Sequence, residues 1–198
     1  MDAVPLRRLH ARRWRPLTAG EIAMVSLLFR DVIDYARVRV YSRRYLPYLQ
    51  PKNCAMTPNG SMYFHRSCFL DDYSQANLTG QHWFMHEMVH VWQHQLGYPV
   101  RLRGAVRFKL PYHYDLHEDA TLADYNMEAQ GDLLADYFVL KFLQRPEAMR
   151  QRRYAGQLEL YERVLAGFLA DPGDRANLHK GFARRLAYLS RPQRIRQA

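Results

Sequence analysis

The sequence has few cysteines and no long hydrophobic run. Two cysteines in 198 residues exclude a disulfide framework, although Cys54 and Cys68 could form one bridge in an oxidising compartment. The most hydrophobic stretch, residues 22–29, is eight residues long, whereas a membrane-spanning helix needs roughly 18. The arginine-rich N-terminus has no apolar segment followed by a small-residue cleavage site. We therefore expect neither a transmembrane segment nor a Sec signal peptide.

Glycine/serine linkers, low-complexity tracts and internal repeats are also absent from the sequence. Hydrophobic residues make up 48% of the chain and aromatic residues 13%, which excludes an intrinsically disordered protein. A chain of this length fits one domain with one hydrophobic core. We expect an arginine-rich arm over residues 1–16, a single folded domain over residues 17–190 and a basic tail over residues 191–198.

Lysine is scarce, since four of the 29 basic residues are lysines and 25 are arginines. The net charge of +10 is unevenly distributed: residues 1–50 carry +6, residues 145–198 carry +7, and residues 51–144 carry −3. Residues 115–136 contain seven carboxylates and no lysine or arginine. Because charge alone is unspecific, we attribute the arginine excess to the base composition of the source genome. The alternative is a basic face attracted to phosphate, to an anionic membrane surface or to a cell-wall polymer.

Hydrophobic periodicity and capping residues predict mostly helices with a few short strands. A capping box begins at Thr18, Gly97 and Pro99 follow the second expected helix, and Pro146 suits the first turn of a fourth. The expected helices cover residues 19–34, 79–96, 121–143, 146–170 and 178–189, and the expected strands cover residues 38–41, 62–64 and 111–115. This pattern predicts an α+β fold with a small sheet and several helices.

The most informative motif is His86-Glu87-Met88-Val89-His90, which has the pattern H-E-x-x-H. At about 100° per residue, both histidines and Glu87 fall on one side of a helix whose other sides are apolar. Buried imidazoles and a buried carboxylate need partners, and one cation supplies a partner for all three. The two imidazoles can bind one Zn²⁺, and Glu87 can act as general base toward a water activated by the metal. The motif predicts a hydrolytic zinc site.

A catalytic zinc site needs a third protein ligand and one open position. Glu128 lies on the next expected helix, where the small Gly131 permits close approach to the helix of the motif. Asp132, one turn later, can accept a hydrogen bond from the far nitrogen of a ligand histidine and so fix its tautomer. Several other carboxylates compete with Glu128 for the role of third ligand, namely Asp119, Asp124, Asp132 and Asp136.

The sequence also offers groups that could stabilise the negative charge of a transition state. His113 lies between Tyr112 and Tyr114, and Tyr125 follows in the acidic segment. Ordinary aromatic packing is the simpler account of each, and the sequence does not choose among the four.

These residues resemble a known group of enzymes. H-E-x-x-H followed by Glu128-x-x-x-Asp132 on a later helix resembles the gluzincins, a group of zincin metallopeptidases, although Met127 stands where thermolysin-type sequences have asparagine. The resemblance implies a zincin-like fold, one Zn²⁺ held by His86, His90 and Glu128, Glu87 as general base, and Asp132 behind a ligand histidine.

A longer resemblance, over residues 14–143, is to the metallopeptidase domain at the C-terminus of some VgrG spike proteins of type VI secretion systems. It is carried by LQPKNCAMTPNG, MYF and HEMVHVWQHQLGYPVRLRG. It implies an antibacterial effector toxin that is cytoplasmic in the producing cell, is secreted without a Sec signal and acts in the periplasm of the target cell. It also implies a spike component and a cognate immunity protein as partners, and a peptide or cell-envelope protein as substrate. We expect an extended substrate to pair with the strand over residues 61–64.

Two alternatives stay open. HEMVHVWQ is also similar to SprT-like proteases, which cleave proteins crosslinked to DNA, but that family has a third histidine shortly after the motif, and no histidine occurs between His94 and His113. We therefore do not expect nucleic acid as a partner. The other alternative is a catalytically silent interaction module that its metal stabilises.

Overall fold

The computed structural model describes residues 14–101 and 112–181, and within them a small sheet forms one side of the molecule. The strands Trp14–Arg15 (β1), Val40–Ser42 (β2) and Met62–Phe64 (β3) lie in the order β1-β2-β3. β1 is antiparallel to β2, and β2 is parallel to β3. Residues 14 and 15 of the expected arm thus join the sheet, and residues 1–13 lie outside the described part.

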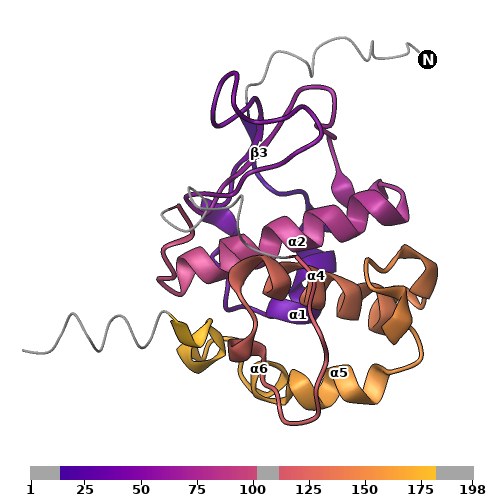
Figure 1. Ribbon diagram of the computed structural model, residues 1–198. Helices are drawn as coiled ribbons and strands as arrows, with labels where there is room; N and C mark the ends of the chain where they lie inside the picture. The colour runs from indigo at the N-terminus through magenta and orange to yellow at the C-terminus, as the bar shows by residue number, and fades with distance from the viewer. Residues whose placement is uncertain (1–13, 102–111, 182–198) are drawn as a thin grey trace, which may run out of the picture.

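The longer helices of the described chain are α1 (Ala19–Phe29), α2 (Leu78–Gln95), α4 (Met127–Phe138), α5 (Leu158–Val164) and α6 (Ala166–Ala170). α4 continues as a π-helical turn over Val139–Leu143, and 3₁₀ turns cover Tyr35–Arg37, Tyr73–Gln75, Leu122–Asp124, Pro146–Ala148, Arg152–Tyr154 and Arg175–Asn177. Figure 1 shows α2 between the sheet with its loops on one side and the other helices on the other. The expected α+β class with a small sheet and several helices is confirmed. Over residues 14–101 and 112–181, no helix is both long enough and apolar enough to cross a bilayer.

α1 begins with the capping box that the sequence predicts. Thr18 Oγ1 accepts a hydrogen bond from the Glu21 backbone at 3.0 Å, and the Glu21 carboxylate accepts one from the Thr18 backbone at 2.9 Å. Arg15 donates to both oxygens of the buried Glu21 carboxylate, and the Tyr73 backbone donates to one of them. This buried ion pair ties β1 and α1 to the 3₁₀ turn before α2. α1 ends at Phe29 and not at residue 34, because Arg30 takes a positive φ of 50° that turns the chain.

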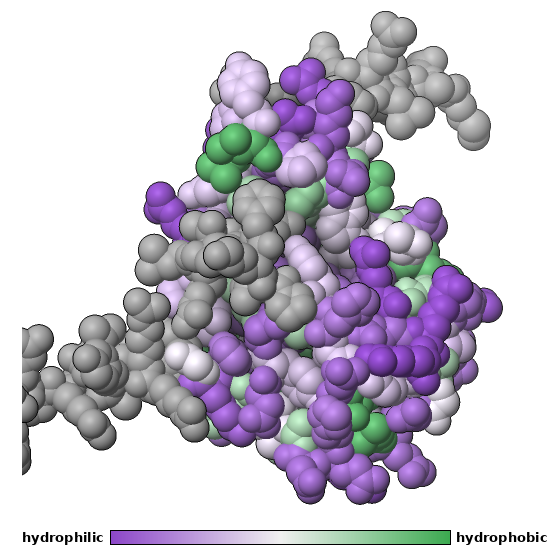
Figure 2. Space-filling view, viewed as in Figure 1, coloured by the Kyte–Doolittle hydropathy of each residue, from purple (hydrophilic) through white to green (hydrophobic). Residues whose placement is uncertain are grey.

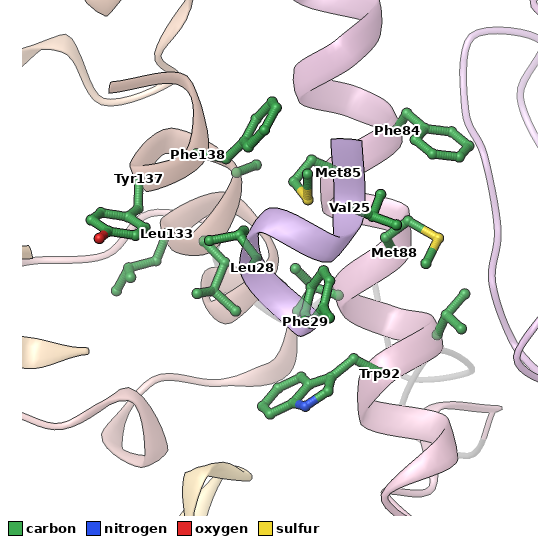
Figure 3. Close-up of a cluster of buried hydrophobic side chains, with 14 of the residues drawn as sticks. Val25, Leu28, Phe29, Phe84, Met85, Met88, Trp92, Leu133, Tyr137 and Phe138 are labelled. Atoms are coloured by element: carbon green, nitrogen blue, oxygen red, sulfur yellow. The ribbon is translucent and has the colours of Figure 1, made fainter. Parts of the chain in front are cut away.

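The hydrophobic core lies where α1, α2 and α4 meet. Figure 3 shows side chains of α1 lying between those of α2 and α4, and the labelled residues include Val25, Leu28, Phe29, Met85, Met88, Trp92, Leu133 and Phe138, all buried. Burying side chains of this size contributes roughly 1.5–3 kcal/mol each. This packing fixes the position of α4 relative to α2.

One predicted element near the site is wrong, and another begins later than predicted. No strand forms over residues 112–115, where side chains satisfy the backbone instead: the Tyr114 carbonyl accepts hydrogen bonds from Gln151 and Arg153. The third helix begins at Met127 and not at residue 121. Its cap is Asn126, which accepts from the backbone N–H groups of Glu128 and Ala129, and the capping box at residue 121 closes only a 3₁₀ turn.

The fourth helix is also not continuous. The backbone N–H groups of Arg150 and Gln151 donate to the carboxylate of Asp136 at 2.6 and 2.9 Å, so they are not available to a helix. The expected helix over residues 146–170 therefore breaks into two 3₁₀ turns and the short α5 and α6. The expected helix over residues 178–189 lies outside the described residues from position 182 onward.

Candidate metal centre

The H-E-x-x-H motif lies in the middle of α2, and Glu128 lies in the first turn of α4, which packs against α2. The Asn126 cap starts α4 two residues before Glu128 and so directs this first turn toward α2. The side chains of His86, His90 and Glu128 are buried, at 6%, 5% and 3% exposure. The structure thus brings together the three residues that the sequence predicts as metal ligands.

One atom from each of these residues faces a common point. The Nε2 atoms of His86 and His90 lie 3.1 Å apart, and Glu128 Oε2 lies 3.3 Å from the first and 3.4 Å from the second. Tetrahedral zinc with ligand distances near 2.0–2.1 Å separates its ligand atoms by about 3.3 Å. Two imidazoles and one carboxylate are also the donor set that zinc prefers, so the residues present fit this ion.

The far nitrogens of both histidines are held by acceptors. His86 Nδ1 donates to Asp132 Oδ1 at 2.7 Å, as the sequence predicts for Asp132, and His90 Nδ1 donates to Gln93 Oε1 at 2.8 Å. Gln93 in turn donates to the Met127 carbonyl and to Gln130. These acceptors keep a proton on Nδ1 of each ring, so both Nε2 atoms can face the ion when one is bound. The sequence analysis missed Gln93, whose only signal is a polar residue on a buried side of α2.

Without a bound ion, the pKa of each buried ionisable group at this site is set largely by the charges of its neighbours. Burial lowers the pKa of His86, but its hydrogen bonds with Asp132 and Glu128 outweigh burial and raise the pKa to about 10. Burial raises the pKa of Glu128, but the charges of His90 and His86 and their hydrogen bonds bring it well below its ordinary value. The pKa of Asp132 is lowered in the same way by His86, against the effect of burial. The site therefore favours a charged carboxylate next to a positive charge.

Glu87 is buried beside the cluster and has a partner that the sequence analysis missed. Thr57 Oγ1 donates to Glu87 Oε2 at 2.5 Å. Both residues line a cavity of about 990 Å³ that also includes the three candidate ligands. The segment over residues 53–58 lines one part of this cavity. Residues of α2 and α4 line it as well, together with Tyr112 and His113. The carboxylate of Glu87 is therefore held in place next to a space that can admit a ligand.

The four residues expected to stabilise a transition state fall into two pairs. Tyr112 and His113 line the cavity, and the ring of Tyr112 lies 6.0 Å from that of His86 in a stacked arrangement. Tyr114 and Tyr125 do not line the cavity. The Tyr114 hydroxyl donates to Asp136, and the Tyr125 hydroxyl donates to the Asp115 carbonyl.

The competing carboxylates do not join the candidate ligands. Asp136 is fully buried and accepts hydrogen bonds from His82, Tyr114 and two backbone N–H groups. Asp124 caps the turn at residue 121 and pairs with Lys180, and Asp119 is exposed. Glu128 is thus the acidic residue that the fold places against both histidines, with Asp132 behind His86.

The expected pairing of a substrate with residues 61–64 needs correction. The Tyr63 backbone already exchanges two hydrogen bonds with Met56, at 2.9 and 3.2 Å, so the segment over residues 53–58 covers this side of β3. The sequence could not show this, because the pairing of Met56 depends on the fold of the intervening turn. The segment over residues 53–58, not β3, borders the cavity.

Comparisons with known proteins agree with one another. No family model matches the chain. Over 156 residues, 75% of its length, the chain is 42% identical to the type VI secretion system spike protein VgrG2b of Pseudomonas aeruginosa, of which it spans only 15%. The solved effector domain of P. aeruginosa VgrG2b matches with a TM-score of 0.61 and 40% identity, over 72% of this chain and 82% of that domain. The chain therefore belongs to the family of the VgrG2b effector domain.

Proposed function

We propose that the protein is a zinc-dependent metallopeptidase. The observation that carries the proposal is the convergence of His86, His90 and Glu128, at 3.1–3.4 Å between their ligand atoms, beside the carboxylate of Glu87 in a cavity wall. Three protein ligands leave a fourth position open, which is typical of catalytic zinc sites and not of structural ones. This donor set supports hydrolysis over a silent metal-stabilised module.

The residues around the cluster have separate roles in this proposal. When bound, Zn²⁺ supplies Lewis acidity, which polarises a carbonyl group and lowers the pKa of water toward about 7. Glu87 accepts a proton on its carboxylate and later delivers it to the leaving amine. Thr57 bonds to Glu87 Oε2 and so leaves Oε1 to exchange the proton. Asp132 and Gln93 hold the two imidazoles in the tautomer that binds metal.

The cavity supports an extended peptide as substrate. Its volume of about 990 Å³ is at the upper end of the range for ligand cavities, roughly 300–1,000 Å³. The segment over residues 53–58 lines it, pairs with β3 through Met56 and carries Thr57 beside the base. A peptide added along this segment would present its backbone to Glu87. Tyr112 and His113 line the same cavity, where they could contact the scissile carbonyl.

The family membership supports a role as a type VI secretion effector. VgrG2b is named as a spike protein of that system, and the domain that matches this chain is named as its effector domain. We propose delivery with a spike component and action on cell-envelope proteins or peptides in the periplasm of the target cell, with a cognate immunity protein in the producing cell. The chain spans 15% of VgrG2b, so the spike functions of that protein are not assigned to it.

The test compares the wild-type protein with Glu87→Gln, Glu128→Gln and a matched control, Glu118→Gln, which changes an exposed glutamate. Zinc content is measured by elemental analysis. Peptide hydrolysis is measured on a denatured protein substrate. Toxicity is measured as the survival of bacteria that express each variant in the periplasm. We expect about one zinc in the wild type, its loss in Glu128→Gln, and zinc retention without hydrolysis or killing in Glu87→Gln.

Each alternative predicts a different result. If the protein is a catalytically silent module, the Glu87→Gln variant should affect bacterial survival as the wild type does. If it is a DNA-associated protease, it should bind duplex or single-stranded DNA with an affinity that falls steeply with salt. A wild-type protein that binds no zinc under zinc-replete conditions would overturn the proposal.

A further inference from the structure

The loop over residues 43–52 carries the two most exposed large hydrophobic side chains among the described residues. Tyr48 is 95% exposed and Leu49 is 75% exposed, and Leu46 in the same loop is 39% exposed. Tyr48 has a positive φ of 71°, a rare backbone conformation for a residue other than glycine. Adjacent apolar side chains that protrude from a surface cost solubility unless they have a use.

The chain on both sides of this loop carries only positive charge. Residues 35–70 contain six basic residues and no acidic residue. Arg44, Lys52 and Arg66 gather around His65, whose pKa is lowered by burial and then by these three charges. In the described ranges, none of the six basic residues forms an ion pair with a carboxylate, and Arg44 Nε is buried without a hydrogen-bond partner. Arg43, Lys52 and Arg66 are exposed, so these three cations are available to an external anion.

Aromatic rings hold part of this positive charge at the sheet. The guanidinium group of Arg43 lies 5.1 Å from the ring centre of Tyr41, which stacks on Tyr63 at 4.5 Å. Arg39 lies 4.9 Å from the ring centre of Trp14. Figure 2 shows hydrophobic residues in green beside hydrophilic residues in purple at this end of the molecule.

We propose that the loop over residues 43–52, together with Arg66, is a docking surface for an anionic phospholipid membrane. In this arrangement Tyr48 and Leu49 enter the interface between headgroups and acyl chains, and Arg43, Lys52 and Arg66 bind lipid phosphates. A convex apolar tip flanked by cations is the form that interfacial membrane attachment requires. Nucleic acid is a poorer fit, because the aliphatic side chain of Leu49 gains little from bases and phosphates. An acidic protein would need a concave surface to cover the protruding tip.

This inference does not depend on the proposed hydrolysis, although the two sites are neighbours. Tyr45 and Leu46 of the loop line the cavity of the candidate metal centre. Docking through the loop tip would place the mouth of the cavity near the membrane surface, where it could reach membrane-proximal segments of envelope proteins.

Vesicle co-sedimentation with the full chain tests the proposal. The probes are vesicles of phosphatidylcholine alone and of phosphatidylcholine with an equal part of phosphatidylglycerol. We expect binding to the anionic vesicles that weakens with salt. Lys52→Ala combined with Arg66→Ala should weaken it about 25-fold, since each basic residue contributes about fivefold. Tyr48→Ser combined with Leu49→Ser should weaken it about tenfold or more, because the buried apolar area is lost.

Matched controls change similar residues elsewhere on the surface. Leu27→Ser alters a side chain that is 51% exposed on α1, and Arg152→Glu alters an exposed arginine outside the loop. Both should bind vesicles as the wild type does, and zinc content and circular dichroism should be unchanged in all variants. Equal binding to both kinds of vesicle overturns the proposal. Loss of binding in the basic variants with no effect of the tip variants also overturns it, since this outcome indicates a polyanion or an acidic protein as the partner.

Discussion

Glu87 is adjacent to His86 in the sequence, but its carboxylate is oriented by Thr57, which is 30 positions earlier in the chain. Thr57 follows Met56, which pairs with β3, so the sheet and α2 together position this side chain. A hydrogen bond to a charged group contributes roughly 1.5–3 kcal/mol. The placement of the proposed base therefore depends on one hydroxyl group.

The change Thr57→Val removes this hydroxyl at nearly constant volume. We expect hydrolysis by the variant to fall about 10- to 100-fold, because the Glu87 carboxylate loses the donor that orients it. Zinc content should not change, since Thr57 contacts none of the candidate ligands. The measurement is kcat on a denatured protein substrate with zinc quantified in the same sample. Thr57→Ser keeps a hydroxyl and should retain most activity; equal rates for Thr57→Val and wild type would show that Glu87 needs no such partner.

α4 approaches α2 closely because it carries Gly131 at the point of contact. A Cβ atom at this position would lie 2.6 Å from Cε1 and 2.7 Å from Nδ1 of His86, well inside contact distance. Asp132 forms its hydrogen bond with this Nδ1 atom. A methyl group at position 131 would therefore displace the His86 ring and break its hydrogen bond with Asp132.

We expect Gly131→Ala to weaken zinc binding by tenfold or more, roughly the cost of disturbing the group that orients a ligand. Alanine favours helix over glycine by about 1 kcal/mol, so an increase in stability would be expected if helix propensity decided the outcome. Competition with a chromogenic chelator measures the affinity. Gly156→Ala is the control, because a Cβ there meets nothing within 4 Å, and it should bind zinc normally.

Asp136 joins four parts of the molecule. Its carboxylate accepts hydrogen bonds from His82 on α2, from Tyr114, and from the backbone of Arg150 and Gln151. These bonds hold α2, the segment at residue 114 and the segment at residues 150–151 against α4. The pKa of Tyr114 is raised by burial and by the charge of Asp136, which keeps the tyrosine hydroxyl protonated as a donor.

The change Asp136→Asn should lower the free energy of unfolding by about 3 kcal/mol, because it replaces an acceptor of four bonds by a group with one acceptor oxygen and leaves His82 without its charged partner. Urea denaturation followed by circular dichroism measures this. Asp119→Asn, at an exposed position, should stay within about 0.5 kcal/mol of the wild type. A similar small change for Asp136→Asn would contradict the role that we assign to this residue.

The metal and the fold of the whole molecule should stabilise each other, because the candidate ligands come from two helices that pack across the core. At a zinc concentration 1,000 times the dissociation constant, binding stabilises the folded state by about 4 kcal/mol. For a chain of this size this corresponds to about 10 °C in Tm. We expect a chelator to lower the Tm of the wild type by this amount and to have little effect on Glu128→Gln.

The size of this effect should depend on pH. The pKa of His86 is raised to about 10 in the metal-free protein, so at neutral pH an ion must displace a proton from this ring. Zinc affinity, and with it the Tm difference, should therefore decrease as the pH falls from 8 to 6. Calorimetry at both pH values, with and without chelator, measures the difference. An equal Tm difference at both pH values would show that His86 binds no proton in the metal-free state.

The residues next to one another on α2 were predictable from sequence because their arrangement is local. His86, Glu87 and His90 share one side of any helix that contains them, and the helix itself follows from its period and from Gly97 and Pro99 after its end. Glu128 and Asp132 were also named from sequence, because α4 carries them on the side that Gly131 leaves open. The strand at residues 62–64 and the capping box that begins α1 follow from similar local signals.

Contacts between distant segments could not be predicted from the sequence in the same way. Thr57 and Asp136 gain their roles from partners on other elements, and no spacing in the sequence predicts which partner each will meet. The same holds for the breaks in the predicted strand at residues 112–115 and the helix at residues 146–170, where tertiary hydrogen bonds to Tyr114 and Asp136 replace the regular backbone pattern. Local periodicity thus specified the helix that carries the motif. The packing of α4 and of the segment over residues 53–58 against it decided which side chains meet at the candidate metal centre and beside Glu87, since burial and hydrogen-bond satisfaction are properties of the folded chain.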